Sequence, residues 1–178
     1  MGVEKRMADR CNTIRLYSFQ TDVVYQVLKR DGVCYSKEEY VRKKYKESAK
    51  VFINAYGWFV KEAQHIVPKP EGAEYPYWAF TDLYNVDQTG DGHVLTLDVP
   101  IGEAILFDMF DWTKIMQMHY IGENESEESA FSEELKNMGM NEFQVMTSNF
   151  YPEQKARIQE SWKRLFGHQQ AIEAGDNS

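Results

Sequence analysis

The sequence contains few cysteines and no long apolar run. Two of its 178 residues are cysteine, Cys11 and Cys34, and they form neither a CxxC motif nor a metal-ligand spacing. Residues 1–10 are polar and lack the apolar centre of a signal peptide. No stretch approaches the roughly 18 apolar residues of a membrane span. We therefore expect a soluble protein with reduced thiols, located in the cytoplasm.

The chain also lacks an excess of positive charge. Its formal net charge is −8 and its pI is about 5.1. A general nucleic-acid-binding domain is usually basic, so we expect no direct binding of nucleic acid. An acidic surface chiefly keeps a protein soluble, although it also allows a protein to imitate nucleic acid in the basic groove of a partner.

Recognisable catalytic motifs are missing as well. The sequence contains no GxSxG, P-loop or GxGxxG pattern. The four histidines, His65, His93, His119 and His168, fall on separate predicted elements without the spacing of zinc ligands. The residues alone therefore do not establish an enzyme.

What the chain does contain is enough apolar material for a folded core. Hydrophobic residues make up 43% of it and aromatic residues 14%. The length fits one domain, which we place at residues 13–167, between a flexible leader at 1–12 and a flexible tail at 168–178. Apolar strands that alternate with one-sided helices predict the α+β class. We expect a small mixed or antiparallel sheet of about four to six strands, flanked by a long helix at about 37–66 and a C-terminal helix at about 153–166.

The first predicted elements are a strand and a short helix. Residues 14–20 read as a strand. Thr21 or Asp22 follows as a candidate N-cap, and apolar residues within 23–28 then share one helix face. Gly32 ends this helix, because glycine readily adopts the left-handed conformation of a helix C-terminus.

Later signals are mostly local as well. Ser36, with a glutamate three residues later, is a capping-box pattern that opens the long helix. Asp111 is a candidate cap for a helix that continues to about residue 120. The other predicted elements are an aromatic strand pair or extended segment at 75–86, strands at 93–100 and 104–107, an acidic loop at 122–128, a short helix from Phe131 that ends at Gly139, and an extended or irregular segment at 142–150.

Residues 87–98 partly match a calcium-binding loop. Asp87, Thr89, Asp91 and Asp98 place oxygens at loop positions 1, 3, 5 and 12, and Gly92 stands at position 6. The threonine, the terminal aspartate in place of glutamate, and the predicted flanking strands favour a Gly-Asp-Gly hairpin turn instead. A calcium module is one hypothesis for this segment.

Four segments, taken in order and spacing, resemble an uncharacterised bacterial and phage family, the domain of unknown function 3841. The similarity spans about residues 14–166 and implies no established activity. The segments are Arg15–Gln20 with its helix and Gly32, Tyr75–Ala79, Val94–Pro100 with Ile105–Trp112, and Ile158–Phe166.

The opening strand and the Val94–Pro100 strand are also similar to the ADP-ribosyltransferase fold, which binds NAD. By this resemblance, Ser18 stands where many members carry His or Arg, and Gln144 is the late polar residue; these two are the candidate catalytic residues. With serine at the first position, the resemblance implies an incomplete catalytic set. The implied NAD contacts are Arg15, Tyr17, Tyr77 and Trp78. Arg15 precedes Ser18 by three residues, so its side chain is expected on the opposite face of the strand.

Two functions follow from these observations. The first is an ADP-ribosyltransferase-like domain that binds NAD or a related nucleotide. The alternative is a non-catalytic acidic binding protein, encoded by a phage, that inhibits a host enzyme or defence complex. A cleft that contains Ser18, Trp78 and Gln144 would favour the first function, and a flat acidic face would favour the second.

Overall fold

The computed structural model describes residues 13–167. The predicted leader, 1–12, and the predicted tail, 168–178, lie outside the described residues. Within the described part, no helix is both long enough and apolar enough to cross a membrane. The single domain predicted for residues 13–167 stays a prediction.

Contacts within the described chain gather into two compact units that alternate along the sequence. Their described residues are 13–44 and 63–105 for unit 1, and 45–62 and 106–167 for unit 2. Each unit therefore consists of two separate stretches of chain. Helices together with an antiparallel strand pair confirm the predicted α+β class.

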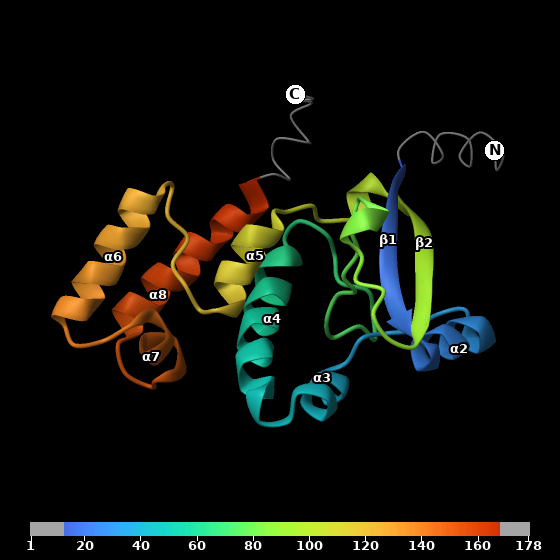
Figure 1. Cartoon of the computed structure of the whole chain (residues 1–178), viewed down its shortest axis with the longest axis horizontal. Helices are drawn as coiled ribbons and strands as arrows, with labels where there is room; N and C mark the ends of the chain where they lie inside the picture. Colours follow the sequence, from blue (N-terminus) through green and yellow to red (C-terminus); the bar gives the residue numbers. More distant parts are fainter. Residues whose placement is uncertain (1–12, 168–178) are drawn as a thin grey trace. The chain divides into compact units, whose positions relative to one another are not determined.

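Unit 1 is built around a pair of nine-residue strands. Its elements are β1 (Thr13–Thr21), α2 (Asp22–Asp31), α3 (Glu38–Tyr45, whose last residue belongs to unit 2), the 3₁₀ turn at Leu83–Asn85, β2 (Gly92–Pro100) and the 3₁₀ turn at Ile101–Glu103. The two strands lie side by side and antiparallel (Figure 1), in a register that runs from Thr13 opposite Pro100 to Thr21 opposite Gly92.

The expected sheet of four to six strands is wrong for the described residues, where the sheet has two strands. The segment 104–107 has no strand pairing, and the segment 75–86 makes isolated bridges at Tyr75 and Phe80. Aromatic residues favour extended backbone. A strand also needs a continuous ladder of hydrogen bonds, to which Pro76 has no N–H to donate. The turn at 87–92 therefore does not join two hairpin strands; it leads into β2, which pairs with β1.

Strand β1 separates two kinds of side chain. Leu16 and Ser18 are buried, whereas Arg15 is exposed and Tyr17 half-buried on the other face. Helix α2 follows β1 without a loop and ends as predicted at Gly32, which has a left-handed φ of 74° and donates its N–H to the Leu28 carbonyl over 2.9 Å.

The long helix expected at 37–66 is instead two helices, α3 and α4 (Ala49–Ala63), separated by a 3₁₀ turn at Lys46–Ser48. At the break Lys46 adopts a left-handed φ of 49°. The rings of Tyr45 and Phe52 stack across it with centroids 3.6 Å apart. Seven residues along an unbroken helix would be separated by roughly 10 Å of rise, so the break allows this stacking. Helix α3 begins at Glu38, whose N–H donates to Glu74 Oε2 over 2.7 Å, and Ser36 forms a β-bridge with Tyr75.

Unit 2 is helical in its described residues. Its elements are the 3₁₀ turn at Lys46–Ser48, α4 up to Glu62, α5 (Met109–Met116), α6 (Glu125–Asn137), α7 (Glu142–Thr147), α8 (Pro152–Ser161) and the 3₁₀ segment Trp162–Phe166. The C-terminal helix is confirmed, with Pro152 in its first turn and its last five residues tightened into 3₁₀ geometry. Trp162 is fully buried and packs edge-on against Trp58, with ring centroids 5.2 Å apart.

Three local predictions in unit 2 are wrong. Asp108, not Asp111, is the N-cap of α5 and accepts the Phe110 N–H over 2.7 Å. The acidic segment expected to be a loop contains the first turn of α6, capped by Asn124. The segment expected to be extended at 142–150 begins with α7, capped by Asn141. In each case a short polar residue that accepts a first-turn N–H fixes the start of the helix.

Candidate functional site

The first candidate site is the contact between β1 and the segment 75–80 in unit 1. Ser18 is 3% exposed; its Oγ donates to the Trp78 carbonyl over 2.7 Å and accepts from Gln20 Nε2 over 2.7 Å. Tyr17 and Phe80 exchange two backbone hydrogen bonds of 2.8 Å each. The structure thus brings Tyr17, Ser18 and Trp78 together, and the Ser18 hydroxyl serves to hold the Trp78 backbone against the strand.

In the sequence, Tyr77 lies between the hydrogen-bonded residues Trp78 and Phe80 and another hydrogen-bonded residue, Tyr75. The Tyr75 N–H donates to the Ser36 carbonyl over 3.3 Å, and its hydroxyl donates to Glu38 over 3.1 Å. Tyr77 is 42% exposed, and its hydroxyl donates to Cys34 Sγ over 3.0 Å. Partial burial is the larger cause, and this hydrogen bond the second, of a pKa of Tyr77 that lies above its ordinary value. The result is an exposed aromatic ring with a fixed orientation.

Arg15 and Gln144 make other contacts. Arg15 forms an exposed two-point ion pair with Asp98, with nitrogen–oxygen distances of 2.8 and 3.2 Å. Its face of β1 is opposite to that of Ser18, as expected. Gln144 belongs to unit 2, in helix α7, where it completes a capping box. Its N–H donates to Asn141 Oδ1 over 2.9 Å, and its Oε1 accepts the Asn141 N–H over 3.0 Å.

The segment that resembled a calcium loop is engaged in other contacts. Asp87 Oδ1 accepts both the N–H and the hydroxyl of Thr89, over 2.9 and 2.7 Å. Asp98 lies on β2 and pairs with Arg15. Within residues 13–167 the structure contains no group of three His, Cys, Asp or Glu side chains that could hold a metal ion.

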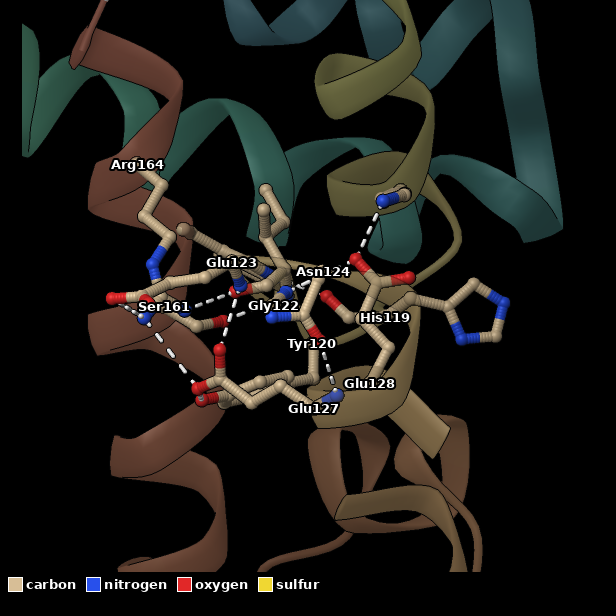
Figure 2. A network of polar contacts seen from close by, with 12 residues as sticks. His119, Tyr120, Gly122, Glu123, Asn124, Glu127, Glu128, Ser161 and Arg164 are labelled. Carbon is tan, nitrogen blue, oxygen red and sulfur yellow. Dashed lines mark hydrogen bonds and ion pairs between the residues drawn. The ribbon is translucent and has the colours of Figure 1, made fainter. Parts of the chain in front are cut away.

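The second candidate site is a polar network in unit 2 that sequence reasoning missed. It is centred on the loop that follows α5 (Figure 2). Helix α5 ends in a Schellman motif, because the Met118 N–H donates to Ile115 O and the His119 N–H donates to Lys114 O, over 2.9 Å each. Met118 occupies the left-handed position with a φ of 63°, and its side chain is fully buried. This turn places His119 at the start of the loop.

His119 is held by a carboxylate from α7. Its Nδ1 lies 2.5 Å from Glu142 Oε2, and the other Glu142 oxygen accepts the Tyr120 N–H over 3.1 Å. Glu142 is 8% exposed, whereas the His119 side chain is 49% exposed. In Figure 2 the imidazole points away from Tyr120 and Arg164.

The Glu142 hydrogen bond raises the pKa of His119 above its ordinary value, although burial partly opposes this. Glu128 adds to the rise, and Lys114 opposes it. An imidazole oriented by a carboxylate through one ring nitrogen is suited to proton transfer or ligand binding through the other. No local signal pairs these two residues, because they lie on different elements of the chain.

The rest of the loop is fixed from both sides. Glu128 of α6 accepts from Lys114 Nζ and from the Gly122 N–H, over 2.5 and 3.0 Å. Glu127 accepts from the Tyr120 hydroxyl over 2.6 Å. From the other side, Ser161 Oγ accepts the Ile121 N–H over 3.0 Å.

Arg164 completes this attachment from the last 3₁₀ segment. Its Nη1 donates to the Ile121 carbonyl over 2.5 Å. Figure 2 shows Arg164 and Ser161 on one side of the loop, with Glu127 and Glu128 reaching it from α6. The loop is therefore a rigid connection, in contrast to most exposed loops.

Comparison with known proteins identifies the family. The model of the Domain of unknown function (DUF3841) matches residues 15–177. The chain therefore belongs to this family, which confirms the resemblance seen in the sequence. Searches of curated proteins and of solved structures found no match.

Proposed function

We propose that unit 1 binds a nucleotide, with NAD or a related molecule as the first candidate, through the ring of Tyr77 next to Trp78. The observation that supports this proposal is the fixed, exposed ring of Tyr77, whose hydroxyl is held by Cys34. Planar bases and nicotinamide rings stack on aromatic side chains. A ring that is already oriented loses little conformational freedom when it binds.

The other candidate residues take supporting roles in this proposal. Ser18 and Tyr17 position the segment of Trp78 through the hydrogen bonds described above. The Ser18 hydroxyl both donates and accepts, so the proposal is one of binding and not of ADP-ribose transfer by Ser18. Arg15 lies on the face of β1 opposite to Ser18, in an exposed ion pair with Asp98, and is not part of the proposed site.

The test is a calorimetric titration of the full chain with NAD and, separately, with ADP-ribose. We expect saturable binding that Tyr77→Ala weakens by about tenfold or more, because a base stacked on an aromatic side chain contributes about 1–3 kcal/mol. Tyr84→Ala is the matched control, since Tyr84 is also in unit 1 and is 93% exposed. Lack of saturation with either ligand at millimolar concentration would exclude the proposal.

A second candidate function, binding of a protein partner without catalysis, is supported by exposed apolar residues in unit 2. Phe110 at the start of α5 is 81% exposed, and Met109 beside it is also exposed. Large exposed apolar side chains that lie together commonly mark interfaces. A protein that binds to the wild type and not to the Phe110→Ser variant in a pull-down would support this function. Equal binding to the wild type and the variant would count against this surface.

A further inference from the structure

Unit 2 contains a pocket of about 640 Å³ beside the rigid loop. Three cations line it, Arg157 from α8 and Lys163 and Arg164 from the last 3₁₀ segment, together with a single carboxylate, Glu160. Tyr120 contributes an aromatic wall. The pocket lies within the range of volumes typical of small-molecule sites.

We propose that this pocket binds a phosphate-bearing small molecule of about nucleotide size. Three cations and one carboxylate line the pocket itself, although the chain as a whole carries a net charge of −8. Guanidinium and ammonium groups are the side chains that recognise phosphate oxygens most strongly. The volume exceeds what a bare phosphate ion needs, which leaves space for the group that carries it.

The three cations differ in how tightly the protein already holds them. Arg157 forms a two-point pair with Glu134, over 2.5 and 3.0 Å, and lies over the Phe131 ring. This arrangement fixes Arg157 as part of the wall. Lys163 pairs with Glu160 over 2.6 Å, three residues earlier on the same helical surface, and both side chains are largely exposed. Exposed pairs of this kind exchange partners easily.

Arg164 is both anchored and available. Its Nη1 donates to the Ile121 carbonyl over 2.5 Å. Its Nη2, in contrast, lies 3.5 Å from Glu123 and from Glu127, at the long limit of a hydrogen bond. A phosphate oxygen in the pocket can approach Nη2 more closely than these carboxylates do.

The carboxylates around the pocket define what the ligand must be. Glu123, Glu127 and Glu134 partner the two arginines but are not among the residues that line the pocket. The ligand must displace Glu160 from Lys163 and compete with the two long contacts of Arg164. A doubly charged phosphate competes better than a single carboxylate, and its binding should weaken as salt is added.

The test uses NMR of the full chain titrated with ADP, inorganic phosphate and adenosine. We expect ADP to bind and to shift the backbone signals of residues 120–123 and 161–167. Inorganic phosphate should shift the same signals at higher concentration, and adenosine should leave them unchanged. Adenosine binding as tightly as ADP, or ADP leaving these signals unmoved, would overturn the proposal. If inorganic phosphate binds as tightly as ADP, the proposal of a nucleotide-sized ligand is wrong.

Variants separate a bound ligand from general attraction of anions. Lys163→Gln should weaken the binding of ADP by about fivefold or more, because it removes an ammonium group that contacts phosphate. The position is exposed, so the fold should not be affected. Lys136→Gln, at the exposed end of α6, removes the same charge outside the pocket and should leave affinity unchanged. Equal weakening in both variants would mean non-specific attraction.

The same experiment is independent of the function proposed for unit 1. A nucleotide that stacks on Tyr77 should shift the signals of residues 75–80 and should respond to Tyr77→Ala. Binding in unit 2 should respond to Lys163→Gln instead. Either site can therefore fail without affecting the result for the other.

Discussion

His119 and Glu142 lie 23 positions apart in the sequence, and yet the histidine Nδ1 is 2.5 Å from the glutamate carboxylate. The carboxylate is buried and the ring is half exposed. The same carboxylate also accepts the Tyr120 N–H, so it joins the end of α5, the following loop and the start of α7.

Replacing this carboxylate should change the titration of the histidine. The Glu142 hydrogen bond is the largest cause of the raised pKa of His119, so Glu142→Gln should lower that pKa. The glutamine retains an oxygen for the Tyr120 N–H, which limits the damage to the fold. NMR titration of the His119 ring proton in wild type and in Glu142→Gln measures the effect. An unchanged His119 titration in Glu142→Gln would contradict the pairing.

The same contact predicts how stability depends on pH. Folding raises the pKa of His119 above its unfolded value of about 6.5. Its contribution to stability is therefore fully present below that unfolded value and is lost as the pH rises through the folded-state pKa. Urea unfolding of wild type and His119→Gln should show a difference in stability that is largest below about pH 6.5 and shrinks as the pH rises above it. A difference that grows with pH would have the wrong sign.

Ser18→Ala should destabilise unit 1. The variant removes a buried hydroxyl that donates to the Trp78 carbonyl and accepts from Gln20, each over 2.7 Å. Loss of such a buried group costs about 1–3 kcal/mol. For a chain of this length that corresponds to roughly 2–4 °C in melting temperature per kcal/mol. Ser132→Ala, at an exposed position of α6, is the control and should melt close to wild type.

Two glycines of unit 2 should respond in opposite directions to alanine. At Gly122 a Cβ atom would lie 2.8 Å from the Asn124 carbonyl oxygen and 2.7 Å from Glu128 Cγ, so Gly122→Ala must displace the loop. At Gly57, an exposed position of α4, a Cβ meets nothing within 4 Å. Gly57→Ala should stabilise by about 0.5–1 kcal/mol through helix propensity. Gly122→Ala should destabilise by about 1–3 kcal/mol. Thermal unfolding of both variants checks this, and two shifts of the same sign would contradict it.

Met118→Gly sets two effects of opposite sign against each other. Glycine would relieve the left-handed φ of 63°, a gain of about 1–2 kcal/mol. It would also remove a fully buried side chain, and such losses cost about 2–5 kcal/mol. We therefore expect net destabilisation in urea unfolding, with Met118→Leu much closer to wild type. A more stable Met118→Gly would show that backbone strain outweighs burial at this turn.

The features that the sequence predicts well are those decided within a few residues. Gly32 ends α2 because its conformation is a local property, and Pro152 opens α8 for the same reason. Asn141, with Gln144 three residues later, is a capping-box pattern that would have revealed α7 and the role of Gln144. Interpreting Gln144 through a resemblance to another fold obscured this simpler signal.

Features decided by distant partners could not be predicted in this way. The break after α3 brings Tyr45 and Phe52 into contact, and a regular apolar spacing does not reveal it. The pairing of β1 with β2 joins residues about eighty positions apart, as in the Arg15–Asp98 pair, whose separation is 83. Apolar segments such as 104–107 resemble strands equally well, and only the available ladder partners decide between them.

The alternation of the two units along the chain has a consequence for synthesis on the ribosome. Strand β1 emerges before β2 and cannot complete its ladder until Pro100 has left the exit tunnel. Residues 49–62 of α4 emerge between the two strands, and the helices of their own unit begin after residue 106. Both units therefore have to wait for later sequence, and neither can be cut out and expressed as one continuous fragment.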